Sequence, residues 1–307
     1  MYKLAILIPS RDEDYLKQTI EDILQHSEAD TEIIVGLDGW KSDFKIWDNP
    51  RIQWVVRQQP IGQRAMTNEL ARLTDAPYLM KIDAHCSFSQ GFDRLMLEDM
   101  AEDITLVPVL LNLRPYRWLC PKGHIQDHSN KKPEKCWCGD LELKKEDIWE
   151  TIPLPITSSF IFDSNLIFGY AEKQSTEILT ETMAIQGSGW MVSAKKYWEL
   201  SLSEEHFGSW GMQSAEVACK TWLSGGRLLN TKKAYMGHWF RGTEDFPYQR
   251  DMKQVDHAKN AVTQLFLNNA WPHQILPIQW LVRKFNFPAD WTEEKLEKLC
   301  TPWDNKK

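Results

Sequence analysis

Four short apolar runs within the first 85 residues limit the fold more than any other feature of this sequence. They cover residues 4–10, 32–39, 52–58 and 77–85. Each has the length and the near-continuous apolar character of a strand that is covered on both faces. Apolar residues recur at helical spacing after the first run and again over 62–74. The order strand, helix, strand, strand, helix, strand predicts an α/β fold with a mostly parallel sheet and helices on both faces.

Polar residues stand at the ends of three of these runs. Ser10 and Arg11 follow the first run, Asp38 ends the second, and Asp83 and His85 end the fourth. The carboxyl ends of parallel strands lie at one edge of a sheet, where ligands bind. Residues two apart on a strand share a face, so Asp83 and His85 could bind one divalent cation. A strand end that runs into a polar turn is the alternative.

Composition narrows the classes of function. The 307 residues are 42% hydrophobic, which is enough for the core of one large domain or two modest ones. A net charge of −7 argues against a domain dominated by nucleic-acid binding. No apolar stretch reaches the roughly 18 residues of a membrane span, and no leader peptide is recognisable. We therefore expect a cytoplasmic protein.

Three cysteines and a histidine crowd one short segment. Cys120, His124, Cys136 and Cys138 fall within 19 residues of polar sequence, and His128 is a further candidate. Thiolates and an imidazole are the ligands of tetrahedral structural zinc. The spacing differs from that of a standard zinc finger, and free cysteines in a loop are the alternative. We predict a zinc-binding insertion over residues 113–150.

This insertion is also the most basic part of an acidic chain. Together with Trp118 and Trp137, a zinc-ordered lobe could grip a polyanion such as DNA. An ordinary solvated face is the alternative for such a run of charge. The basic residues are Arg114, Arg117, Lys122, Lys131, Lys132, Lys135, Lys144 and Lys145.

A set of motifs between residues 184 and 241 carries a family resemblance. The motifs are, in order, Gly187 to Tyr197, Trp210-Gly211 with Glu216, Gly225-Gly226, and Gly237-His238 with Arg241. This order resembles the catalytic domain of polypeptide N-acetylgalactosaminyltransferases and, more loosely, family 2 glycosyltransferases. The segments 8–13, 61–71 and 81–86 resemble earlier motifs of the same family.

The resemblance covers roughly residues 4–112 and 154–270. It implies a GT-A glycosyltransferase domain over 1–270, interrupted by the insertion, with a helical extension over 271–307. It also implies that Asp83, His85 and the remote His238 hold Mn²⁺ or Mg²⁺. Such an ion neutralises charge on a departing diphosphate. A hydrogen-bonded core histidine is the alternative for His238.

Further donor contacts follow from the resemblance. Arg241 is expected at the diphosphate, because a guanidinium group matches phosphate in a bidentate way. Asp38 is expected at the nucleobase or ribose, and Arg11 and Arg64 are additional candidates for the nucleotide. A simple turn at Asp38 and a solvated helix position for Arg64 are the alternatives.

The segment 241–252 resembles the loop that covers the donor in these enzymes. With Trp239, Pro247 and Tyr248 it would close over the sugar and exclude water. An ordinary surface loop is the alternative.

The chain departs from the family pattern next to Trp210. Gln213 replaces the family's glutamate and Ser214 its asparagine, and neither side chain can act as a base. Glu216 lies further along a predicted helix. We expect Trp210, Gln213 and Glu216 at the catalytic centre, with retention of configuration and the leaving phosphate as proton acceptor. A base from elsewhere, such as Glu181, is the alternative.

The resemblance therefore predicts a metal-dependent hexosyl- or N-acetylhexosaminyltransferase that uses a UDP-sugar and a hydroxyl acceptor. Peptide, glycan, lipid and hydroxymethylated DNA remain open as acceptors. The last would suit a virus-encoded enzyme in a bacterial host. A decayed transferase domain that binds nucleic acid or protein, and a metal-dependent nucleotidyltransferase, are the competing functions.

Overall fold

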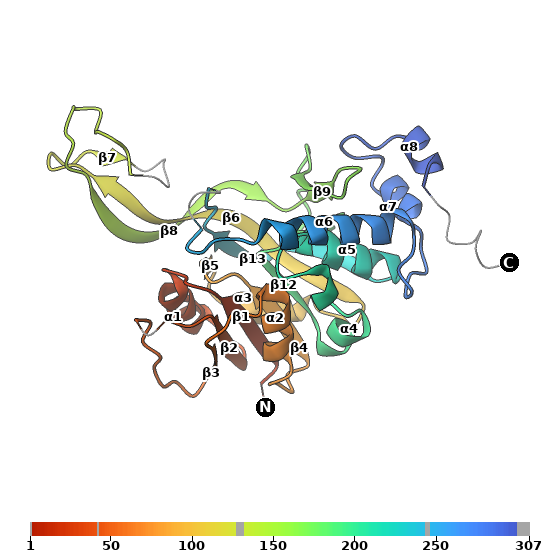
Figure 1. Ribbon diagram of the computed structural model, residues 1–307, viewed down its shortest axis with the longest axis horizontal. Helices are drawn as coiled ribbons and strands as arrows, with labels where there is room; N and C mark the ends of the chain where they lie inside the picture. The colour runs from red at the N-terminus through yellow and green to blue at the C-terminus, as the bar shows by residue number, and fades with distance from the viewer. Residues whose placement is uncertain (1, 42, 127–131, 243–245, 300–307) are drawn as a thin grey trace.

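The four predicted strands form one half of a large mixed sheet (Figure 1). The computed structural model describes residues 2–41, 43–126, 132–242 and 246–299. Strands β1 (Leu4–Ser10), β2 (Thr31–Asp38), β3 (Ile52–Arg57) and β4 (Tyr78–Ile82) lie parallel in the order β3-β2-β1-β4. Buried apolar side chains fill β1 and β2, as expected for strands covered on both faces.

Two helices connect these strands. Helix α1 (Leu16–His26) leads from β1 to β2, and α2 (Gln63–Ala71) leads from β3 back across the sheet to β4. The two connections run in opposite directions along the sheet. Right-handed crossovers therefore place α1 and α2 on opposite faces.

The second half of the sheet contains longer strands. β12 (Gly189–Ser193) pairs antiparallel with β4 and with β6 (Ile104–Leu119), and β13 (Arg227–His238) runs parallel to β6. β11 (Leu179–Glu181) pairs antiparallel with β13. Along this path of eight described strands, only β12 and β11 oppose the common direction. The predicted mostly parallel sheet is confirmed in this sense.

The remaining elements surround this sheet. α5 (Gln213–Leu223) is the predicted helix that carries Glu216, and α6 (Met252–Leu267) follows β13. α7 (Ile278–Lys284) and α8 (Glu293–Glu297) lie within the predicted helical extension over 271–307. No helix in the described ranges has the length and apolarity of a bilayer span. The other elements are β5 (Cys86–Phe88), α3 (Phe92–Glu98), β9 (Phe160–Phe162), β10 (Phe168–Tyr170), α4 (Ala194–Glu199) and a 3₁₀ turn at Glu205–Phe207.

The predicted insertion is an arm that projects from the body (Figure 1). It consists of the end of β6 and the start of β8 (Lys144–Thr157), which pair antiparallel, with β7 (Ile125–Gln126) at the tip. β6 pairs with β13 as far as Asn112 and continues beyond it for seven residues. Most of β8 is solvent-exposed, so its sequence lacks the apolar alternation that would have predicted a strand.

Candidate active site

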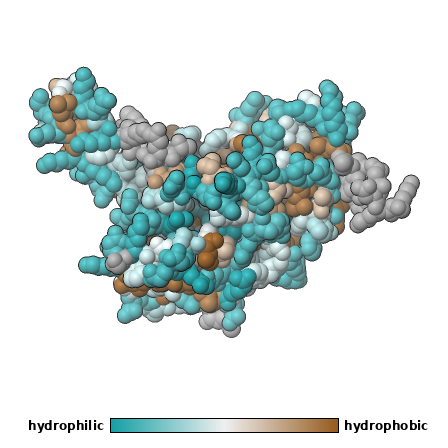
Figure 2. Space-filling model, viewed as in Figure 1, coloured by the Kyte–Doolittle hydropathy of each residue, from teal (hydrophilic) through white to brown (hydrophobic). Residues whose placement is uncertain are grey.

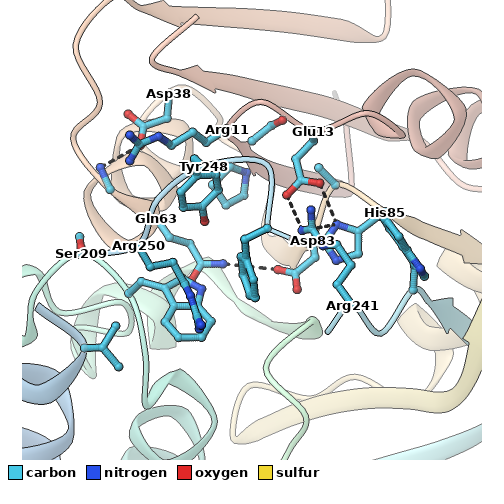
Figure 3. A pocket seen from close by; sticks show the side chains of 18 of the residues that line it. Arg11, Glu13, Asp38, Gln63, Asp83, His85, Ser209, Arg241, Tyr248 and Arg250 are labelled. Atoms are coloured by element: carbon cyan, nitrogen blue, oxygen red, sulfur yellow. Dashed lines mark hydrogen bonds and ion pairs between the residues drawn. The ribbon is translucent and has the colours of Figure 1, made fainter. Parts of the chain in front are cut away.

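A cavity of about 410 Å³ lies where the parallel strands end (Figure 3). The structure brings Arg11, Asp38, Asp83 and His85 together in its lining, as predicted for polar groups at separate strand ends. The rest of the wall comes from residues that follow β13, from the start of α2, and from Gln186, Ser209 and Trp210.

Three candidate metal ligands converge in this cavity. The ligand atoms of Asp83, His85 and His238 lie within 4.8 Å of one another. His238 Nε2 is 3.1 Å from His85 Nε2 and 3.3 Å from Asp83 Oδ2. Neighbouring ligands of an octahedral ion bound at about 2.1 Å are about 3 Å apart. Two imidazole nitrogens and a carboxylate oxygen that face one another at this spacing fit a divalent cation such as Mn²⁺.

Glu13 orients one of these ligands. Its Oε2 lies 3.1 Å from Nδ1 of His85, and its Oε1 accepts a 2.7 Å hydrogen bond from Arg241 Nη2. A carboxylate at Nδ1 leaves the lone pair of Nε2 free for a metal. Burial alone would raise the pKa of Glu13, but His85 and Arg241 lower it below its ordinary value. No role was predicted for Glu13, although it ends the motif at 8–13.

Lys81 and Gln63 hold the carboxylate of Asp83. Lys81 Nζ lies 2.5 Å from Oδ1 and also donates to the carbonyl of Gly187, while Gln63 Nε2 lies 3.4 Å from Oδ1. Oδ2 is thereby directed at His238. Burial opposes the charge on Asp83, but Lys81 and His238 hold its pKa below the ordinary value. The sequence did contain a signal for this contact, because Lys81 is a lysine within an otherwise apolar run, but it was overlooked.

His238 is prepared to act as a neutral ligand. Burial lowers its pKa to about 4, although the nearby Asp83 acts in the opposite direction. The ring is therefore uncharged at neutral pH, so that Nε2 can offer a lone pair.

Asp38 shapes the cavity by fixing the turn before α2. Its carboxylate accepts the backbone N–H groups of Ile61 and Gly62 at 2.6 and 2.8 Å. Gly62 has a φ of +94°, and a Cβ there would lie 2.5 Å from Cβ of Ser209. A side chain at this position would therefore be strained in two ways.

Arg64 and Glu216 do not reach the cavity. Both are almost fully buried, and Arg64 Nη2 lies 3.0 Å from Glu216 Oε2. Lys220 Nζ lies 3.1 Å from the other oxygen of Glu216. This buried ion network joins α2 to α5. The structure thus gives Arg64 and Glu216 a structural position in place of the expected donor and catalytic contacts.

Of the other two predicted catalytic residues, one lines the cavity and one does not. Trp210 lines the cavity, whereas Gln213 is buried outside the lining and donates to the hydroxyl of Ser203 at 3.2 Å. Glu181, the alternative base, lies in β11 at the sheet edge and pairs with Lys284 at 2.6 Å.

The segment after β13 covers one side of the cavity with aromatic and cationic side chains (Figure 3). The guanidinium of Arg250 lies 4.1 Å from the ring centre of Phe246 and 5.2 Å from that of Trp210. Arg11 lies 4.7 Å from the ring centre of Tyr248. Residues 243–245 of the predicted loop lie outside the described residues, and Pro247 lines a neighbouring cavity.

A second group of candidate metal ligands lies at the tip of the arm. Cys120, His124, Cys136 and Cys138 have ligand atoms within 4.8 Å of one another. The structure therefore brings all four predicted ligands together. His128, the spare candidate, lies outside the described residues.

Comparison with known proteins identifies relatives. No protein-family model matches the chain. "Putative polypeptide N-acetylgalactosaminyltransferase 13" of Drosophila melanogaster is 24% identical over 330 residues, which cover 94% of this chain and 52% of that protein. N-acetylgalactosaminyltransferase 7 of Homo sapiens is 22% identical over 210 residues, which cover 66% of this chain and 27% of that protein.

The fold has a solved relative. The crystal structure of GalNAc-T7 with UDP, GalNAc and Mn²⁺ matches with a TM-score of 0.66 and 14% identity, covering 92% of this chain and 56% of that one. The chain spans about half, or less, of the length of these relatives. The matches confirm the predicted GT-A fold and the resemblance to N-acetylgalactosaminyltransferases.

Proposed function

Because the chain is a GT-A relative of the polypeptide N-acetylgalactosaminyltransferases, we propose that it is a metal-dependent glycosyltransferase. The sugar would pass from a UDP-sugar, of the hexosyl or N-acetylhexosaminyl type, to a hydroxyl acceptor. One observation carries the proposal: Asp83, His85 and His238 converge in a cavity at the strand ends, beside Arg241. The orientation of these ligands by Glu13 and Lys81 favours a working site over a decayed one.

The cavity has the chemistry that a sugar nucleotide requires. A bound Mn²⁺ would neutralise charge on the leaving diphosphate. Arg11, Arg241 and Arg250 line the same cavity and can donate paired hydrogen bonds to phosphate oxygens. Phe246 and Tyr248 supply apolar surface that would keep water from the sugar.

The carboxylates of the cavity support retention of configuration. The described lining contains four: Glu13, Asp38, Asp83 and Asp251. Glu13 and Asp83 belong to the metal site, Asp38 accepts two backbone N–H groups, and Asp251 caps α6 by accepting the N–H of Lys253. Each is already engaged, so none is placed as a free general base. We propose that the leaving phosphate accepts the acceptor's proton.

The arm does not favour DNA as the acceptor. Arg117 forms an ion pair with Glu146, and Lys145 lies 4.3 Å from the ring centre of Tyr116. Asp147 and Glu150 of β8 add negative charge to the same ribbon. The thiolate-rich cluster at its tip suits zinc, in contrast to the oxygen and imidazole set of the cavity, and takes no part in the proposed transfer.

The proposal is tested by measuring UDP release from a panel of UDP-sugars with and without Mn²⁺. We expect Mn²⁺-dependent release for at least one donor and its loss in His238→Ala. His273→Ala is the matched control, because His273 is exposed and lies outside the cavity lining. Equal release by wild type and His238→Ala, or no donor accepted by a folded Mn²⁺-loaded protein, would contradict the proposal.

A further inference from the structure

We infer that the tip of the arm is a structural zinc site formed by Cys120, His124, Cys136 and Cys138. Cys120 and Cys136 place Sγ at 3.5 and 3.6 Å from His124 Nδ1, and Cys120 Sγ is 4.0 Å from Cys138 Sγ. A tetrahedral zinc with Zn–S bonds of about 2.3 Å and a Zn–N bond of about 2.0 Å separates sulfurs by about 3.8 Å. The same geometry separates sulfur from nitrogen by about 3.5 Å. The observed spacing is that of a zinc coordination shell.

A disulfide does not explain this spacing. A sulfur–sulfur bond is about 2.05 Å long, half the distance between Cys120 and Cys138. Both are free cysteines, as is Cys136. Three thiol groups beside one imidazole nitrogen, without a bond between them, form a complete set of four ligands of the kind that tetrahedral zinc binds.

The backbone presents the cysteines in two matching turns. The N–H of Gly123 donates to the carbonyl of Cys120 at 2.9 Å, and the N–H of Gly139 donates to that of Cys136 at 2.8 Å. Both glycines have positive φ values, +80° and +88°. The carbonyl of the residue after each glycine accepts the N–H of the cysteine, at 3.1 and 2.7 Å. The shared C-x-x-G pattern was visible in the sequence, and the ligand atoms that the two turns bring together could hold one ion.

The core of the tip is small in the residues that the structure describes. Its buried apolar cluster consists of Cys120, Cys136 and Leu143, with Trp118 and Cys138 partly buried against it, and three of these five are proposed ligands. Trp137 and Leu141 are about 70% exposed, and Figure 2 shows apolar surface at the end of the otherwise hydrophilic arm. So small a core cannot offset the loss of chain entropy, whereas metal binding contributes directly to folding.

The site is structural rather than catalytic. Four protein ligands complete the tetrahedron, so no position remains open for water or substrate. Gln126 Nε2 lies 3.7 Å from Cys136 Sγ, as expected for an outer partner of a zinc-bound thiolate. This inference goes beyond the proposed transfer activity and does not depend on it.

Metal analysis of the purified full chain tests the inference. We expect one zinc per chain in wild type, almost none in Cys136→Ser, and full zinc in Cys219→Ser, which changes a buried thiol of α5 outside the cluster. Full zinc in His238→Ala distinguishes this site from the cavity. In cobalt-loaded wild type, we expect the absorption of tetrahedral thiolate-bound Co²⁺.

A wild-type measurement covers the case in which Cys136→Ser does not fold. Removal of zinc by a chelator should expose three reactive thiols and speed proteolysis within 120–143, while the thermal unfolding of the body is retained. A wild-type protein without zinc after growth in zinc-supplemented medium, zinc retained in folded Cys136→Ser, or iron in place of zinc would overturn the inference.

Discussion

At the scale of single residues, the candidate metal ligands are oriented by side chains that are not candidate ligands themselves. Glu13 accepts from Arg241 and faces Nδ1 of His85, and Lys81 holds one oxygen of Asp83. Asp83 and His85 were predictable, because alternation along a strand places them on one face. The role of Glu13 was not predictable in the same way, because it arises from contacts with distant parts of the chain, whereas Lys81 lies two residues from Asp83 and was overlooked.

Replacing Glu13 by Gln should weaken Mn²⁺ binding without unfolding the protein. The amide cannot hold Nδ1–H of His85 as a carboxylate does, and loss of such a partner typically costs about 10- to 100-fold in metal affinity or activity. Mn²⁺ titration of UDP release measures this change. Glu21→Gln is the control, because Glu21 is exposed and pairs only with Lys17 in the described structure. Unchanged Mn²⁺ affinity in Glu13→Gln would contradict the role given to Glu13.

The lowered pKa of His238 predicts a pH dependence of stability in the metal-free protein. The pKa is about 4 in the folded state and 6.5 in the unfolded state. The unfolded state therefore binds the proton first, and the free energy of unfolding falls as pH drops from about 7 to 4. Between pH 7 and pH 5 this residue should account for a loss of about 2 kcal/mol.

Urea denaturation in EDTA at pH 7 and pH 5 checks this value. His238→Gln carries no titrating group at this position, so it should lose about 2 kcal/mol less than wild type. His273→Gln should behave as wild type. Equal losses in wild type and His238→Gln would show that His238 titrates normally.

At the scale of elements, the sequence predicted the first half of the sheet and an insertion over 113–150, but not the paired strands that make this insertion an arm. β1, β2 and β4 are largely buried and apolar, so composition marks them as strands, whereas β3 is a half-buried to exposed strand at the sheet edge and not the strand covered on both faces that its apolar run predicted. The arm strands are exposed on much of their surface and are held by backbone hydrogen bonds, which leave no apolar pattern. Arg64 and Glu216 were misplaced because neither motif order nor spacing shows that α2 and α5 share a buried ion network.

Glu216→Gln should destabilise the fold while leaving the site chemistry intact. It leaves the buried cations of Arg64 and Lys220 short of negative charge, and breaking such a pair costs about 3–5 kcal/mol. Glu69→Gln, which breaks an exposed pair with Arg57, should cost less than about 1 kcal/mol. Urea denaturation measures both losses. Loss of kcat in the folded fraction of Glu216→Gln, with normal stability, would instead support the catalytic role predicted from sequence.

At the scale of the whole molecule, the body and the arm each contain one of the two groups of candidate metal ligands. The metal ligands of the cavity lie in the body, since His238 pairs in register with Asn112, where β6 leaves β13. An aromatic cluster joins the two parts: Trp239 of the cavity packs against Tyr15 and Tyr116 at the base of the arm.

Shortening the arm should therefore spare the donor site. Arg117 and Glu146 are paired across β6 and β8, so an Asn-Gly turn between them can replace residues 118–145. This variant keeps Tyr116 and Trp239, and its thermal stabilisation by UDP with Mn²⁺ should equal that of wild type. A variant that folds but no longer responds to UDP would show that the arm belongs to the donor site.

The length of β6 determines how far the tip of the arm lies from the candidate metal site. The seven residues beyond Asn112 carry the tip about 23 Å past the level of His238, at about 3.3 Å per residue. A molecule that touches both the tip and the reacting centre must bridge that gap. A free monosaccharide or a single amino acid is far too short, whereas an extended peptide of about seven residues is long enough. Only a polymeric acceptor could therefore contact the tip and the reacting centre at the same time, and truncation of such a polymer below that length would remove the contact with the tip.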